Sequence, residues 1–254
     1  MLPAERHRRI CAALRAQRIV STEEFSRMLD VSQETVRRDL VTLERRGLLV
    51  RVHGGATNTA GGFGEEPPFD ERSGLERQAK VAIGAAAAAL VRPGQTVVID
   101  IGTTAVEVAR ALPADHRGTV ATCSLLVAAE LSTRPNIEVL VSGGRLRAGD
   151  LACSNAQALA FFADLRADVA FLGSGGVDAS AGLTDFHLDE VATRRLMLAN
   201  TVRSYILADS SKFGRVAPHR VCGLEDVDGL ITDARPSSTL ESGMERSGGV
   251  VVVA

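Results

Sequence analysis

The chain has 254 residues, of which 45% are hydrophobic and 24% charged, and its formal net charge is −2. This composition is typical of a globular protein and excludes a disordered or fibrous chain. The longest apolar run, "AIGAAAAALV", has ten residues, too few to span a bilayer, and the charged start "MLPAERHRRI" is unlike a secretory signal. We therefore expect a cytoplasmic protein with no membrane partner and with room for a small and a medium-sized domain.

Cysteine and histidine are widely spaced. None of the four cysteines belongs to a Cys-x-x-Cys pair, and no histidine shares a metal-ligand spacing with a cysteine or with another histidine. This spacing predicts neither a disulfide framework nor a metal site, and it fits a reducing compartment.

Charge is distributed unevenly. Residues 1–58 hold 11 basic and 7 acidic side chains, and the remainder holds 18 and 24, so the two parts carry +4 and −6. A basic small domain joined to an acidic larger one is consistent with nucleic-acid binding combined with a second role. The basic part starts with a predicted helix over 5–17, whose inward positions are Ile10, Ala13 and Leu14.

A second helix with a well-formed N-terminus is predicted over 22–29. Ser21 is its N-cap, Glu24 completes a capping box, and Val20 is placed to contact Phe25 across the cap. The predicted inward positions of this helix are Phe25, Met28 and Leu29.

The same pattern recurs eleven residues later and predicts a third helix. Ser32 is the cap, Val31 precedes it, and the inward positions are Val36, Leu40 and Leu43. This helix is expected to end at Gly47, after the cations Arg45 and Arg46. Because only "DVS" separates the two capped helices, they must cross steeply, as in a helix-turn-helix.

The segment "LLVRVHGGAT" predicts two short strands joined by a glycine turn at His53–Gly55, which is typical of a wing. The exposed face near the start of the third helix carries side chains suited to DNA bases and phosphates. The predicted DNA-binding residues belong to this face, to its N-cap and to the wing: Ser32, Gln33, Glu34, Thr35, Arg37, Arg38, Arg51 and His53. The alternative is that Arg37 and Arg38 are merely solvated and pair with Glu34 or Asp39.

The stretch "TNTAGGFGEEPPF" is rich in glycine, proline and threonine and lacks apolar periodicity, which predicts a linker over 58–69. The predicted domains are accordingly 1–57 and 70–254. The second begins with a predicted helix over about 70–91, whose inward positions are Leu75, Ala79, Ile83, Ala86 and Leu90.

Seven apolar runs then alternate with helical segments: "TVVID", "TVATC", "IEVLVSG", "DVAFLGS", "SYILAD", "GLITD" and "GVVVVA". Continuous apolar strands separated by helices predict an α/β domain with a doubly wound, mostly parallel sheet. In such sheets ligands bind beyond the carboxyl ends of the strands.

Four of these ends carry polar or glycine-rich residues. "IDIGTT" places Gly102, Thr103 and Thr104 at a helix N-terminus, where an anion is favoured, and Ser124 has the same relation to the next helix. "VSGGRLRAGD" and "FLGSGGVDASAGLTD" add glycines together with Asp178 and Asp185. No Walker A or G-x-G-x-x-G motif occurs, so a phosphate in a small ligand fits better than a nucleotide, and no cofactor is predicted. Any one of these loops could instead simply form a turn or cap.

The residues also resemble a known family. "VSTEEFSRMLDVSQETVRRDLVTLERRGLLVRVHGGA" is similar to the winged-helix domain of the DeoR-type bacterial regulators over about 5–57. Over about 70–233, "IDIGTT", "TCS", "SGGRLR", "GLTD", "DEVATRRLM" and "ADSSKFGR" resemble its sensor domain, which is similar to ribose-5-phosphate isomerase. The resemblance implies operator DNA as partner and a phosphorylated sugar as effector, held by Asp100, Gly102, Thr103, Thr104, Ser124, Gly143, Gly144, Glu190 and Lys212.

Three positions depart from the family pattern. Ile101 replaces a serine, Cys123 replaces an asparagine and Arg194 replaces a lysine. Loss of a hydroxyl and an amide predicts that ligand hydroxyls are recognised differently, whereas Arg194 retains charge in a planar fork suited to carboxylate or phosphate. Without the resemblance, Lys212 could equally be a solvated surface lysine.

Two functions follow as hypotheses. The first is a transcription regulator, by resemblance a repressor, that acts as a homo-oligomer, a dimer or tetramer, on half-sites ~34 Å or a multiple apart. The second is a sugar-phosphate isomerase fused to a DNA-binding module, with Asp178, Asp185 or Glu190 as general base. The first is preferred, because the sequence has no dense acid–base motif, and no catalytic residue is assigned.

Overall fold

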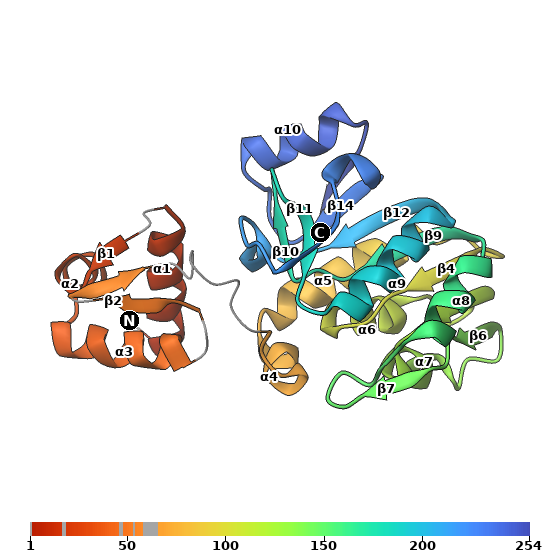
Figure 1. Cartoon of the computed structure of the whole chain (residues 1–254), viewed down its shortest axis with the longest axis horizontal. Helices are drawn as coiled ribbons and strands as arrows, with labels where there is room; N and C mark the ends of the chain where they lie inside the picture. Colours follow the sequence, from red (N-terminus) through yellow and green to blue (C-terminus); the bar gives the residue numbers. More distant parts are fainter. Residues whose placement is uncertain (1, 17–18, 46–47, 53, 58–65) are drawn as a thin grey trace. The chain divides into compact units, whose positions relative to one another are not determined.

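The computed structural model describes residues 2–16, 19–45, 48–52, 54–57 and 66–254 (Figure 1). The chain divides into two compact units, Met1–Pro67 and Pro68–Ala254. Most of the predicted linker, 58–65, lies outside the described residues, as do Arg46, Gly47 and His53.

The N-terminal unit packs three helices against a small sheet. In chain order its elements are α1 (Pro3–Ala16), β1 (Ile19–Ser21), α2 (Thr22–Leu29), α3 (Gln33–Arg45), β2 (Val50–Val52) and β3 (Gly55–Thr57). The predicted second helix and its capping box are confirmed: the Glu24 amide donates to Ser21 Oγ at 3.1 Å, and the Ser21 amide donates to Glu24 Oε2 at 3.2 Å. The fully buried side chains of Ile10, Phe25, Val36 and Leu43 belong to its core.

Two details of this unit differ from the sequence prediction. Met28 was expected to point inward but is 45% exposed, because α2 directs Phe25 and Leu29 into the core and leaves Met28 beside that face. The sheet has a third strand, β1, which pairs antiparallel with β3. Val20 therefore lies in a strand as well as beside the helix cap. A Cβ on Gly55 would lie 2.3 Å from the carbonyl oxygen of Val20, so this pairing requires glycine there.

The C-terminal unit is built on a seven-stranded parallel sheet of order β15-β14-β12-β9-β4-β5-β6. Its strands are β4 (Thr96–Ile99), β5 (Gly118–Thr122), β6 (Ile137–Val141), β9 (Ala167–Leu172), β12 (Thr201–Leu207), β14 (Gly229–Thr232) and β15 (Val250–Val253). These are the seven apolar runs of the sequence, and the predicted α/β fold class is confirmed. Strand order reverses beside β4, so the carboxyl ends of β4 and β9 form the switch point.

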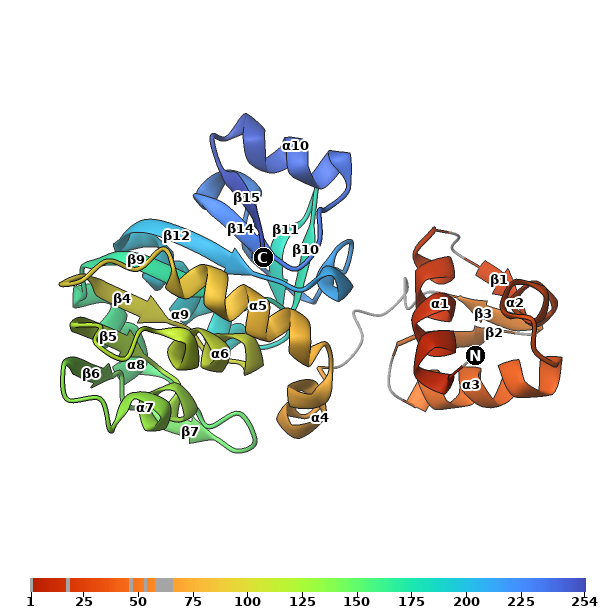
Figure 2. The same cartoon turned by 180° about the vertical axis from the view of Figure 1, so that it is seen from behind.

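Helices cover both faces of the sheet. One apolar core includes residues of α5 (Arg77–Ala88), α6 (Thr103–Ala111) and α7 (Leu125–Leu131), and Figure 2 shows α5 and α6 in front of the strands. The opposite core includes residues of α8 (Ala156–Asp164), α9 (Leu188–Ala199) and α10 (Ser238–Arg246). Of the helices described, none is long and apolar enough to cross a bilayer.

The predicted helix over 70–91 is interrupted. It forms α4 (Phe69–Gly74) and α5, and between them Glu76 has a left-handed φ of +48°. Leu75, predicted to be buried, is 42% exposed at this break. The buried Lys80 ammonium donates to the carbonyl oxygens of Arg72 at 2.5 Å and Leu75 at 2.7 Å, and so adds hydrogen bonds to carbonyl groups at the end of α4.

Short antiparallel strands and turns lie outside the seven strands that the sequence predicts. β7 (Arg145–Arg147) pairs with β8 (Ala152–Ser154) as a hairpin. A second small sheet contains β10 (Gly176–Asp178), β11 (Gly182–Asp185) and β13 (His219–Cys222). Two single-turn 3-10 helices complete the unit, η1 (Ser210–Lys212) and η2 (Leu224–Asp226).

Candidate functional site

The start of α3 presents a charged, solvent-facing surface. Ser32 caps the helix, because its Oγ accepts from the Thr35 amide at 3.2 Å. The apolar face is buried, and the side chains of Arg37 and Arg38 are 64% and 79% exposed. Both arginines lie near Glu34, at 3.8 Å and 3.4 Å, so one alternative considered from the sequence, pairing with Glu34, does occur.

Asp39 does not pair with these arginines. Its buried carboxylate accepts from Arg6 Nε at 2.7 Å and lies 3.0 Å from His7 Nε2, which ties α3 to α1. Burial alone would raise the pKa of Asp39, but the hydrogen bonds from Arg6 and His7 lower it below its usual value. No local pattern indicated this role, since the partners are more than 30 residues away.

The wing is tied to α3 by Arg51. Its backbone amide donates to Glu44 Oε1 at 3.0 Å, and its Nε lies 3.4 Å from Glu44 Oε2. The Arg51 side chain is nevertheless 45% exposed, and it lies on β2 beside the exposed Val50 and Val52.

The end of β4 brings several predicted effector residues together. Gly102 has a φ of +106° and precedes α6, whose first turn holds the half-buried Thr103 and Thr104. Asp100 is buried beneath this loop, and its Oδ2 accepts from the Gly173 amide at 2.9 Å. The carboxyl ends of β4 and β9 are thus joined through this carboxylate.

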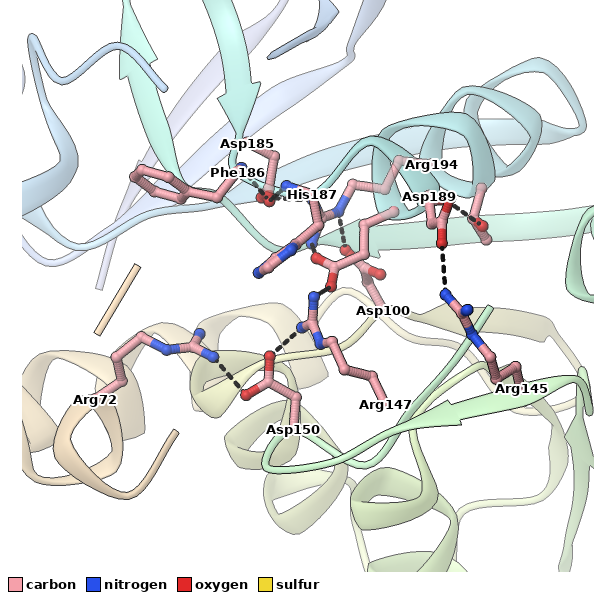
Figure 3. A network of polar contacts seen from close by, with 12 residues as sticks. Arg72, Asp100, Arg145, Arg147, Asp150, Asp185, Phe186, His187, Asp189 and Arg194 are labelled. Atoms are coloured by element: carbon pink, nitrogen blue, oxygen red, sulfur yellow. Dashed lines mark hydrogen bonds and ion pairs between the residues drawn. The ribbon is translucent and has the colours of Figure 1, made fainter. Parts of the chain in front are cut away.

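Arg194 is the centre of a buried charged cluster (Figure 3). Its guanidinium, 3% exposed, contacts Asp100 and Asp185, each at 2.5 Å, and lies 3.5 Å from Glu190. Burial alone would lower the pKa of Arg194, but the three carboxyl groups raise it well above its usual value. Burial raises the pKa of Glu190 to about 8, and Asp185 adds to the rise although Arg194 opposes it.

The charged cluster continues to α4. Arg147 of β7 contacts both Glu190 and Asp150, and Asp150 accepts from Arg72 Nη2 at 2.7 Å. Figure 3 shows Arg147 and Asp150 of the β7–β8 hairpin and Arg72 of α4 pointing toward one another. No sequence pattern indicated these contacts, because they join residues that share no motif.

A cavity of about 470 Å³ opens beside this cluster. It is lined by Arg145, Leu146, Arg147, Ala152, Ser154, Phe186, His187, Leu188, Asp189 and Glu190. Of the twelve predicted effector residues, Glu190 alone is in this lining. Across the ranges that are described, no group of three or more His, Cys, Asp or Glu side chains is arranged to hold a metal ion.

Other predicted effector residues have identifiable structural contacts. The fully buried Ser124 caps α7 by accepting from the Val127 amide at 3.2 Å. Asp178 accepts hydrogen bonds from Ser180 and Ala181 in the β10–β11 turn. Ser124 and Asp178 are therefore not part of the charged cluster around Arg194.

The remaining predicted effector residues lie before β7 and in η1. Gly143 and Gly144 precede β7, and both have positive φ. A Cβ on Gly144 would lie 2.4 Å from the Ser154 carbonyl oxygen, so that glycine allows the hairpin to close. Lys212 ends η1 and is half-buried.

The departures at Ile101 and Cys123 affect packing. Each side chain is 4% exposed and belongs to the apolar core on the α9 face of the sheet. Burial also raises the pKa of the Cys123 thiol well above its usual value. Neither side chain offers a ligand the polar group that the family pattern has at that position.

A winged helix with an exposed arginine-bearing helix, followed by a separate α/β domain with a charged cavity, defines a DNA-binding regulator with its own sensor domain. Residues 6–60 match the family described as DeoR-like helix-turn-helix domain, and residues 75–234 match the DeoR C terminal sensor domain. The chain therefore belongs to the DeoR family of transcription regulators.

Several known proteins are similar to this chain. The HTH-type transcriptional regulator GolR of Listeria innocua is 33% identical over 100% of both chains. The glycerol-3-phosphate regulon repressor of Escherichia coli is 34% identical over 93% of both chains. Ribose 5-phosphate isomerase A from Methanocaldococcus jannaschii is similar in structure over 55% of each chain, with 16% identity and a TM-score of 0.41; this likeness carries no conclusion about activity.

Proposed function

We propose that this regulator is a repressor that reads operator DNA through α3 and the wing. The contacting residues would be Ser32, Gln33, Glu34, Thr35, Arg37, Arg38, Arg51 and His53. The observation that carries this is the exposure of Arg37 and Arg38 on the first turns of a helix capped by Ser32. Their contacts with Glu34 are surface pairs, worth only ~0.3–0.5 kcal/mol, and DNA phosphates would readily replace them.

The effector in this proposal is a phosphorylated sugar or polyol. The name of the E. coli relative makes glycerol 3-phosphate a first candidate. Its phosphate would lie at the start of α6, where Gly102, Thr103 and Thr104 offer backbone amides and two hydroxyls at a positive helix end. The full proposed site is Asp100, Gly102, Thr103, Thr104, Ser124, Gly143, Gly144, Asp178, Asp185, Glu190, Arg194 and Lys212.

In this proposal the protein acts in the cytoplasm as a homo-oligomer and has no catalytic role. A general base must lie within hydrogen-bond reach of the proton that it abstracts, whereas Asp185 is paired with Arg194 and Asp178 accepts hydrogen bonds within its own turn. Incubation with pentose and hexose phosphates tests this point. Turnover that Asp100→Ala or Glu190→Ala abolishes would establish the isomerase alternative.

Paired substitution of Arg37 and Arg38 by alanine tests the interaction with DNA. The variant should bind the protein's own upstream region more weakly, and the slope of log affinity against log salt should fall by ~0.9 for each phosphate that the protein no longer neutralises. Fluorescence anisotropy over a salt series measures both. The matched control is Arg110→Ala with Arg235→Ala, which removes two exposed arginines of the sensor domain; equal slopes in all three proteins would refute the assignment.

A further inference from the structure

Two cysteines from distant parts of the sequence meet where the end of β5 contacts β8. The Cys153 amide donates to the Cys123 carbonyl oxygen at 2.7 Å, and their neighbours Ser124 and Ala152 form an antiparallel bridge. Residues opposed across such a pair direct their side chains to the same face. Both cysteines are free thiols, and both side chains belong to the apolar core on the α9 face of the sheet.

The backbone spacing at this contact suits a disulfide. Opposed residues that share a hydrogen bond in an antiparallel pair have Cα atoms ~5.5 Å apart, and a disulfide joins Cα atoms that are ~4.4–6.8 Å apart. Joining Cys123 to Cys153 therefore requires side-chain rotation rather than a shift of the strands. The family pattern has asparagine at position 123, so this pair is a feature of the chain's own sequence.

Hydrogen peroxide is an oxidant that can form this bond. Burial raises the pKa of the Cys153 thiol, and it raises the pKa of Cys123 well above its usual value, so Cys153 ionises first. The Cys153 thiolate attacks one oxygen of the peroxide, the O–O bond breaks, and a sulfenic acid and hydroxide form. The Cys123 sulfur then loses its proton and displaces the sulfenic hydroxyl group. Two thiols and one peroxide thus give one disulfide and two waters.

Access to the thiols requires local opening of the β7–β8 hairpin. Its two strands have three residues each, and so short a pair opens at a lower free energy than the whole domain unfolds. Because only the thiolate reacts, oxidation is slower than at an exposed cysteine of ordinary pKa. In a reducing compartment both residues stay thiols, and an added dithiol reverses the bond.

We propose that Cys123 and Cys153 form a reversible disulfide on exposure to hydrogen peroxide, and that this bond fastens the β7–β8 hairpin to the carboxyl end of β5. Ser124 follows at that end, and the hairpin carries Arg147 of the charged cluster. A fastened hairpin opposes rearrangement of the cluster. The consequence for regulation rests on the proposed function: the oxidised protein needs at least ~5-fold more effector to release DNA.

A full-length protein that retains only this pair tests the bond directly. Cys11→Ala with Cys222→Ala removes the other two cysteines. After treatment with hydrogen peroxide, denaturation and alkylation, its intact mass should show the loss of two hydrogens and no alkylated thiol. Dithiothreitol should restore both thiols. The disulfide should also raise the thermal melting temperature by at least ~4 °C. In the oxidised wild type, peptide mapping should find Cys123 linked to Cys153.

Two single variants are the matched controls. Cys123→Ala and Cys153→Ala each leave one thiol of the pair, so neither can form the bond. Peroxide should leave the melting temperature of both without the rise seen in the protein that keeps the pair. The amount of glycerol 3-phosphate that releases the protein's own upstream DNA should likewise be the same before and after peroxide in both variants.

The inference is overturned if both thiols of the pair remain alkylatable after peroxide, if they end as sulfinic acids, or if they link only between chains. An equal rise in melting temperature in Cys123→Ala also overturns it. If the disulfide forms but the oxidised protein needs no more glycerol 3-phosphate, the regulatory consequence is wrong. If neither redox state binds the DNA, the proposed function fails and the disulfide stands.

Discussion

Arg194 illustrates how one buried side chain can organise a site that no local pattern shows. Its guanidinium is shared among carboxyl groups 94, 9 and 4 residues away, at Asp100, Asp185 and Glu190. The sequence predicted all four residues as effector residues, but could not show that they contact one another. As a buried cation, Arg194 needs these partners, since an unpaired buried charge is strongly destabilising.

Glu190 should make folding stability depend on pH. Its pKa is raised to about 8 in the fold, above the ordinary 4.5. Protonated Glu190 therefore favours the folded state. This stabilisation is fully present below pH ~4.5, declines as Glu190 of the unfolded chain ionises, and is lost above pH ~8. Glu190→Gln removes the titrating proton, so its thermal melting temperature should fall less than that of the wild type between these pH values. Parallel declines in the two proteins would contradict the assignment.

At the scale of elements, the parallel strands were predictable and the small antiparallel ones were not. A strand buried on both faces is a continuous apolar run, which the sequence displays directly. By contrast, β1, β7 and β8 have three residues each, too few to establish an alternating pattern. Gly74 indicated a break between α4 and α5. The regular spacing of apolar residues across 70–91 instead predicted one continuous helix.

Gly55 gives an element-scale prediction for the wing. Gly55→Ala would place a Cβ 2.3 Å from the Val20 carbonyl oxygen and separate β3 from β1. We expect a decrease of about 1–3 kcal/mol in the stability of the N-terminal unit, as for other overpacked sites, and weaker operator binding. Urea unfolding measures the first. Gly74→Ala, which meets nothing within 4 Å, is the control; equal stabilities of the two variants would disprove the close-packing argument.

At the scale of the whole molecule, regulation requires that effector binding in one unit change DNA affinity in the other. Composition alone separated a basic from an acidic part, and motifs predicted residues for both sites. What sequence could not supply was the set of contacts from Asp100 to Arg72, because side chains join the end of β4, α9, the β7–β8 hairpin and α4. To reverse a 99:1 occupancy, the effector must discriminate between the two states by ~5.5 kcal/mol.

The most direct measurement is operator affinity of the full-length protein with and without phosphorylated sugars and polyols, glycerol 3-phosphate among them. We predict tight binding to the protein's own upstream DNA at low salt and release by one of these phosphates. Thr103→Asp and Lys212→Ala should bind the same DNA but need more than ~10-fold higher effector for release. If the protein does not bind this DNA at low salt, with or without the phosphates, the claim that it is an effector-controlled DNA-binding regulator is contradicted.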